Sequence, residues 1–177
     1  MKKIIPILMM AAFAFTPLVM AGTGEEHEGL PPPYVGSAEF EALKTLAGKW
    51  EGTHQMSEKT DSTTAEYEVT SNGSVVLEKL FSGTPHEMVT TYYEREGKLS
   101  MIHFCSLANR PLMNMVTSSE GKIEFDLASD SDIDVAQPHM HGLVLSMIDD
   151  DNLIHNWTFY ENGEISGITN ITLSRVK

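Results

Sequence analysis

The sequence predicts an all-β protein, an antiparallel up-and-down barrel of about ten strands that follows one short N-terminal helix. Three observations favour this fold class. From Lys49 onward, apolar and polar residues alternate with the period of two that is typical of half-buried strands. Short breaks of turn-forming residues separate the alternating segments, and the one stretch with helical spacing comes before them. A two-sheet sandwich of the same strands is the alternative topology.

The first 21 residues have the three parts of a secretory signal peptide. Lys2 and Lys3 give a positive start, Ile4–Phe15 is apolar, and Val19–Ala21 has the small-x-small pattern of a cleavage site. The apolar run is too short for a comfortable membrane span. We therefore expect cleavage before Gly22, export to the bacterial periplasm or beyond, and no stable membrane insertion after cleavage.

Residues 22–36 are acidic and then proline-rich, without periodicity, which predicts a flexible leader ahead of a barrel domain at 37–177. The formal net charge is −13 at pH 7, and basic clusters are absent, so nucleic acid is excluded as an expected partner. Cys105 is the only cysteine. An exported domain without a disulfide pair must be stabilised by its hydrophobic core.

The helix is expected at Ser37–Ala47. Ser37 is a suitable N-cap, and Phe40, Leu43 and Leu46 form an apolar stripe before Gly48 ends the helix. The strands that follow are bounded by turn signals such as Asn-Gly and Glu-Gly pairs. Their expected ranges are Trp50–Met56, Ala65–Asn72, Ser74–Phe81, Glu87–Glu94, Leu99–Cys105, Leu112–Ser118, Lys122–Leu127, His141–Ile148, Leu153–Tyr160 and Ile165–Val176.

The segment LKTLAGKWEG, in which a short helix runs into Gly48-x-Trp50, resembles the start of calycin barrels, the lipocalins and their relatives. In that superfamily a late basic residue packs over the first-strand tryptophan, and Arg175 is placed to do so here. The resemblance implies that Gly48, Trp50 and Arg175 close one end of a barrel. A guanidinium on an indole face contributes about 0.5–2 kcal/mol.

Two bacterial branches of that superfamily are similar to this chain. Exported lipocalin-like domains of unknown function share the opening and a His-x-Cys and Asn-x-Pro segment like HFCSLANRP. The nitrobindin-like barrels are similar only in architecture. They hold haem through a histidine on a late strand, so the second resemblance implies a possible haem ligand here.

Alternation places Met101, His103 and Cys105 on one face of their strand. Two ligands do not make a zinc site, but His141 and His155 are further candidates for a transition-metal site with this pair. The simpler interpretation is that Cys105 packs as a small hydrophobic residue. No motif of a thiol hydrolase or other enzyme is present, so a binding protein is favoured and enzymatic activity is left open.

His155 is the best candidate for a haem ligand, because Trp157 shares its face and haem needs one axial ligand in an apolar cavity. Asn109 and Arg110 lie in a polar connection. A loop Arg at a barrel rim can hold a ligand carboxylate, or it can form a simple salt bridge. The expected ligand-binding set is His103, Asn109, Arg110, Asn114, Met101, Trp157 and His155.

These patterns together predict an exported barrel that binds a small, largely apolar or amphipathic molecule in its interior. The alternative is a haem or transition-metal protein that uses His155, or His103 and Cys105 with His141.

Overall fold

The structure is a computed structural model that describes residue 29 and residues 31–177. The predicted signal peptide and most of the predicted leader lie outside the described residues. Residues 32–177 form one compact unit. In the described part of the chain, no helix has the length and apolar character needed to cross a membrane.

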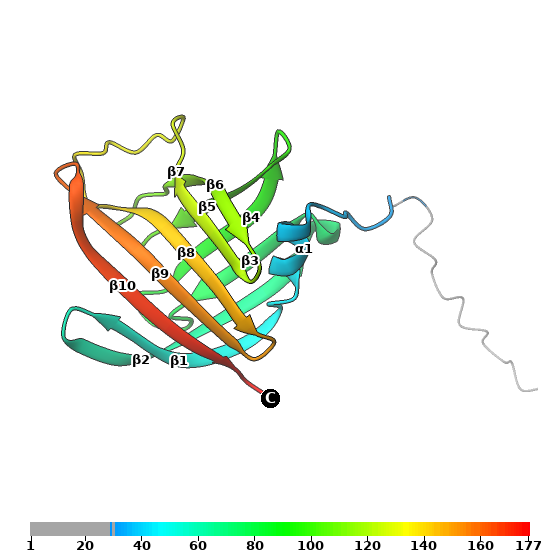
Figure 1. Cartoon of the computed structure of the whole chain (residues 1–177), viewed down its shortest axis with the longest axis horizontal. Helices are drawn as coiled ribbons and strands as arrows, with labels where there is room; N and C mark the ends of the chain where they lie inside the picture. Colours follow the sequence, from blue (N-terminus) through cyan, green and yellow to red (C-terminus); the bar gives the residue numbers. More distant parts are fainter. Residues whose placement is uncertain (1–28, 30) are drawn as a thin grey trace, which may run out of the picture. The chain divides into compact units, whose positions relative to one another are not determined.

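The unit holds one α-helix, one short 3₁₀ turn and ten strands, as Figure 1 shows. The helical elements are α1 (Ala38–Lys44) and η1 (Ser71–Gly73). The strands are β1 (Gly48–Met56), β2 (Lys59–Thr70), β3 (Val75–Leu80), β4 (Met88–Arg95), β5 (Lys98–Phe104), β6 (Leu112–Ser119), β7 (Lys122–Leu127), β8 (His139–Asp149), β9 (Asn152–Glu161) and β10 (Glu164–Arg175).

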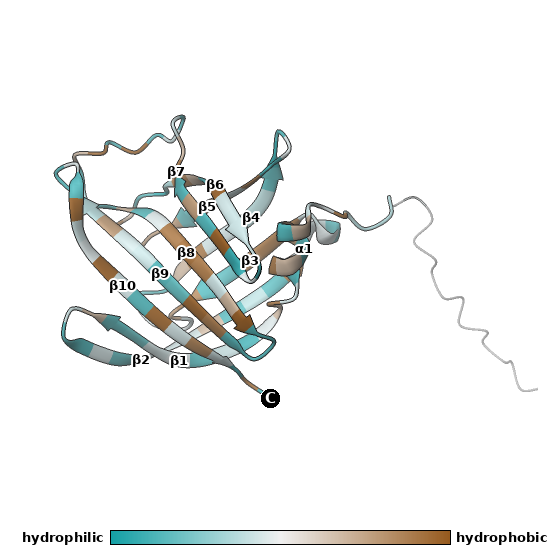
Figure 2. Ribbon diagram, viewed as in Figure 1, coloured by the Kyte–Doolittle hydropathy of each residue, from teal (hydrophilic) through white to brown (hydrophobic). Residues whose placement is uncertain are grey.

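The ten strands form a closed antiparallel barrel in which each strand pairs with its neighbours in sequence. The ring closes where β1 pairs with β10, with Trp50 opposite Arg175 and Met56 opposite Thr169. This confirms the predicted fold class and excludes the sandwich. Hydrophobic and hydrophilic residues alternate along β10 in Figure 2, as expected for a strand with one face inside a barrel.

The largest difference from the expected strand ranges is at the start of β2. This strand begins at Lys59, six residues before the expected Ala65. The segment KTDSTT is polar on both faces and carries no alternation. It forms a strand because β1 pairs with it along a long hairpin, in which Met56 lies opposite Lys59.

Helix α1 is shorter than expected. Ser37 is its N-cap, as predicted, and its side chain accepts a hydrogen bond from the backbone N–H of Phe40 at 3.3 Å. The helix ends at Lys44, and Thr45 is the C-cap. Phe40 and Leu43 are fully buried, so the apolar stripe attaches α1 to the core.

The last residues before α1 are held against the barrel. Tyr34 donates its backbone N–H to the carbonyl of Asn72 at 2.8 Å, and its hydroxyl bonds the carboxylate of Glu94 at 2.5 Å. The backbone N–H of Ser37 donates to the same carboxylate at 2.9 Å. The segment Pro32–Gly36 is therefore part of the compact unit.

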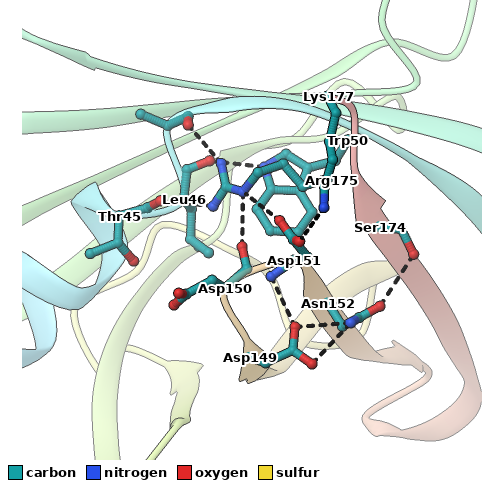
Figure 3. Close-up of polar contacts among 11 residues, drawn as sticks. Thr45, Leu46, Trp50, Asp149, Asp150, Asp151, Asn152, Ser174, Arg175 and Lys177 are labelled. Carbon is teal, nitrogen blue, oxygen red and sulfur yellow. Dashed lines mark hydrogen bonds and ion pairs between the residues drawn. The ribbon is translucent and has the colours of Figure 1, made fainter.

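Arg175 caps the end of the barrel at which β1 begins and β10 finishes, which we call the capped end (Figure 3). Its guanidinium carbon lies 4.2 Å from the centre of the Trp50 ring. Its donors reach the carbonyls of Thr45, Ala47 and Asp150 at 2.8–2.9 Å. Gly48 has a φ of +133°, and a Cβ there would lie 3.1 Å from the guanidinium. The guanidinium thus joins the helix end, the first strand and the β8–β9 turn.

Candidate functional site

A row of polar side chains crosses the inner wall of the barrel. Tyr67 on β2 lies opposite Glu78 on β3, Glu78 opposite Thr90 on β4, and Thr90 opposite His103 on β5. Directly opposite residues of antiparallel strands point to the same face. All four side chains are at most 2% exposed. The ladders therefore bring four polar groups from four consecutive strands into the core.

Two residues of β9 meet this row from the other side of the interior. The hydroxyl of Tyr67 and Nε2 of His155 are 2.9 Å apart. Two residues further along β9, the Trp157 ring lies 4.5 Å from the His103 ring, measured between centroids. Because residues i and i+2 of a strand share a face, one strand contacts both ends of the row. We call these six residues the polar layer.

Glu78 has several partners within and beside the polar layer. Tyr92 donates its hydroxyl to Oε2 of Glu78 at 2.7 Å. Oε1 of Glu78 lies 3.6 Å from Nδ1 of His155, which is too long for a hydrogen bond. Nδ1 of His103 and the hydroxyl of Thr90 are 2.9 Å apart. The layer is thus a chain of contacts with a gap between Glu78 and His155.

Burial decides the charge of the polar layer. It raises the pKa of Glu78 to about 7, although hydrogen bonds from Tyr92, Tyr67 and Thr90 act in the other direction. Burial also lowers the pKa of His103 to about 4 and that of His155 to about 3. Since desolvation disfavours the charged form of each group, both histidines are neutral at pH 7.

Four polar atoms of the layer lack a hydrogen-bond partner among the protein atoms. They are Oε1 of Glu78, Nε2 of His103, Nδ1 of His155 and Nε1 of Trp157. Each buried, unpaired polar group costs about 1–3 kcal/mol. Together they oppose a large part of the ~5–15 kcal/mol that stabilises a typical domain. The layer therefore keeps hydrogen-bonding capacity that the chain itself does not use.

The structure brings some of the sequence-predicted residues together and separates others. His103, His155 and Trp157 meet in the polar layer, and Met101 is fully buried on the same face of β5 as His103. Asn114 lies on the other face of β6 from Met113, where its side-chain oxygen accepts a hydrogen bond from Ser100 at 2.8 Å. Asn114 is not in the polar layer.

Asn109 and Arg110 lie in the β5–β6 connection, away from the polar layer. Asn109 donates to the carbonyl of Pro138 at 2.9 Å, which ties two loops together. Arg110 is exposed and pairs with Asp132 at 2.5 Å. An outer hollow of about 210 Å³ lies beside this ion pair. Arg110 therefore forms a simple salt bridge, which is one of the two interpretations that the sequence left open.

The metal candidates are spread over different faces. Cys105 contacts the sulfur of Met88 at 3.8 Å. The His141 ring stacks on the Tyr160 ring with 3.8 Å between the centroids, and its Nδ1 lies 2.9 Å from Nε2 of His139. Within residues 29 and 31–177, no group of three or more His, Cys, Asp or Glu side chains is arranged to hold a metal ion.

The surroundings of His155 do not fit an axial haem ligand. Its Nε2 is hydrogen-bonded to the hydroxyl of Tyr67, and its Nδ1 lies 3.6 Å from Oε1 of Glu78. The ring is fully buried. Either nitrogen would have to leave the polar layer to bind iron, so we derive no haem chemistry from this residue.

A larger hollow lies at the capped end, away from the polar layer. Its volume is about 440 Å³, and Asp149, Asp150, Asp151 and Arg175 help to line it. Asp149 accepts hydrogen bonds from Asn152, Asp151 pairs with Lys177, and Arg175 donates to the backbone carbonyl of Asp150, as Figure 3 shows. We therefore place the candidate site at the polar layer, where the buried groups remain unpaired.

The sequence reasoning missed Glu78, Tyr67 and Thr90. In the β3 segment VVLEKL, both faces carry apolar residues. Alternation therefore does not show whether Glu78 points into the core or to the outside. The signal that finds these residues is the strand register. Aligning β2, β3, β4 and β5 at their turns places Tyr67, Glu78, Thr90 and His103 in one row.

No family model matches the sequence, and no curated protein matches it. Solved structures do match. A protein of unknown function from the DUF3598 family of Nostoc punctiforme PCC 73102 has a TM-score of 0.51 and 16% identity, over 84% of this chain and 53% of that one. Rv2717c from M. tuberculosis has a TM-score of 0.45 and 13% identity, over 81% of this chain and 100% of that one.

The likeness to the Nostoc protein shows the barrel fold alone. This chain spans about half the length of that protein.

Proposed function

We propose that this protein is an exported, lipocalin-like barrel that binds a small, largely apolar molecule in its interior, with the polar layer holding the polar group of that molecule. The observation that carries the proposal is the set of four unpaired polar atoms, which come from both sides of the barrel interior and lie among the residues of the hydrophobic core. Small-molecule sites are mostly apolar with a few placed polar groups.

The residues next to the polar layer support an amphipathic ligand. On the side away from the capped end, the buried positions next to the polar layer are Leu80 on β3, Met88 on β4 and Cys105 directly after β5. Phe81 and Met140 are half-buried and pack against the same core. A ligand that enters from this end would place its apolar part among these side chains, because the polar groups lie deeper.

Export rests on the predicted signal peptide at residues 1–21. Expression of the full chain in a bacterium, followed by fractionation, tests it. We expect the protein in the periplasm or medium with Gly22 at its N-terminus. Full-length protein that stays in the cytoplasm would contradict this part of the proposal and leave the binding site untouched.

Binding is tested with the neutral apolar fluorophore N-phenyl-1-naphthylamine and delipidated protein. The chain has two tryptophans, Trp50 and Trp157. In the variant Trp50→Phe, excitation of Trp157 should transfer energy to the bound fluorophore with a saturable dependence on concentration. In Trp157→Phe, transfer from Trp50 at the capped end should be weaker.

A folded protein that shows no saturable binding would overturn the proposed function. Transfer that is stronger from Trp50 than from Trp157 would place the fluorophore at the capped end, and it would overturn the assignment of the site to the polar layer.

A further inference from the structure

We propose that the polar layer selects an uncharged ligand head that both donates and accepts a hydrogen bond, such as the hydroxyl of a medium-chain alcohol, over a carboxylate or an ammonium group. This inference rests on the proposed function and adds the chemical class of the ligand. The argument uses the donor and acceptor roles of the unpaired atoms.

Trp157 supplies the donor. An indole Nε1–H donates only, and in this protein it is buried without a partner. Trp157 is 2% exposed, so water reaches it poorly. A ligand atom at this position must therefore accept a hydrogen bond.

His103 supplies the acceptor. We assign the proton of His103 to Nδ1, which then donates to the Thr90 hydroxyl 2.9 Å away, because the carboxyl of Glu78, opposite Thr90 in the β3–β4 ladder, attracts the hydroxyl proton of Thr90. A neutral imidazole that carries its proton on Nδ1 has a lone pair on Nε2. Nε2 of His103 is buried and unpaired. A ligand atom at this position must therefore donate a hydrogen bond.

A single hydroxyl satisfies both demands. The ring centroids of His103 and Trp157 lie 4.5 Å apart, and the rings are tilted by 41°, so the donor and the acceptor belong to neighbouring rings of the core. The oxygen of a hydroxyl group can accept a hydrogen bond from Nε1–H of Trp157, while its O–H donates a hydrogen bond to Nε2 of His103. A carboxylate can only accept, and an ammonium can only donate, so each leaves one of the two atoms unpaired.

The charges of the core also favour a neutral head. Among the buried residues of the described chain there is no Lys or Arg, so a buried carboxylate would lack a cationic partner. Burying an unpaired charge is far more costly than burying a hydroxyl. Glu78 is the one acidic residue among these buried groups, and its unpaired Oε1 lies 3.6 Å from Nδ1 of His155.

The test is displacement of bound N-phenyl-1-naphthylamine at pH 7 by compounds with equal carbon chains: 1-octanol, octanoate and octylammonium. We expect 1-octanol to displace the fluorophore at a concentration at least about tenfold lower than either ion, a difference of about 1.4 kcal/mol. In Trp157→Phe, which keeps an aromatic ring and removes the donor, the advantage of 1-octanol should shrink several-fold. Trp50→Phe is the matched control, and it should keep the wild-type order.

Octanoate or octylammonium that displaces as well as 1-octanol would overturn the inference, while the proposed binding site would stand. A Trp157→Phe variant with the wild-type preference would also overturn it, because the donor would have no role. Failure of wild-type protein to bind the fluorophore at all is the separate outcome that removes the proposed function.

Discussion

Replacing Glu78 by Gln should change how the stability of the barrel depends on pH. Burial raises the pKa of this carboxyl from 4.5 to about 7. Because the folded protein binds the proton of this carboxyl more tightly than the unfolded chain does, the protonated carboxyl contributes stability at low pH. This contribution is lost as the pH rises from 4.5, the ordinary pKa, through the folded-state pKa of about 7. At 1.36 kcal/mol for each pH unit, the complete loss is about 3 kcal/mol. Gln has nearly the same shape and no titration.

The assay is urea unfolding at pH 5, 6, 7 and 8, followed by circular dichroism. The free energy of unfolding of Glu78→Gln, minus that of the wild type, should rise by about 2–3 kcal/mol from pH 5 to pH 8. Other titrating groups are common to both proteins and cancel in this difference. The same replacement at the exposed residue Glu164 controls for the loss of a negative charge. A difference that is independent of pH would refute the assignment of Glu78 as a buried, protonated group.

The remaining predictions concern the capped end and the buried histidines. Arg175→Lys should lower the free energy of unfolding by about 1–3 kcal/mol in urea denaturation, because lysine cannot stack on Trp50 and reach three carbonyls at once. Arg110→Lys, in an exposed ion pair, should change it by less than about 0.5 kcal/mol, and equal effects would argue against the cap. His155 has a folded-state pKa lowered to about 3 by burial, so the stability that it contributes above pH 6.5 is lost as pH falls towards 3. His155→Gln should flatten the fall in stability between pH 6.5 and pH 4, and an unchanged slope would count against a neutral buried imidazole.

Alternation and turn chemistry were enough to predict most of the barrel from the sequence. The predicted range Lys122–Leu127 is that of β7, and β6 differs from its predicted range by one residue. These strands carry their own periodicity and end at local turn signals. The start of β2 was missed because its polar residues form a strand only through pairing with β1. That information is not local, and a sequence window does not contain it.

The candidate site was predicted in part, for a related reason. Alternation grouped His103 with Met101 on one face of their strand and Trp157 with His155 on one face of theirs, and the structure buries both groups. Glu78 was missed because β3 is apolar on both faces. Asn114 was placed among the ligand-binding residues, but it lies on the other face of β6 from the buried Met113. Which residues meet across the interior depends on all the strand registers together, and no single strand encodes them.

The pairing of β1 with β10 has a consequence for the order of events when the chain folds. This ladder joins residues such as Trp50 and Arg175, which are separated by nearly the whole length of the barrel sequence. Until β10 has left the ribosome, β1 and β9 each present an unpaired strand edge. Contacts between distant segments form slowly, because the long intervening chain must first be ordered. The nascent chain therefore stays open and accessible to chaperones until its last strand emerges.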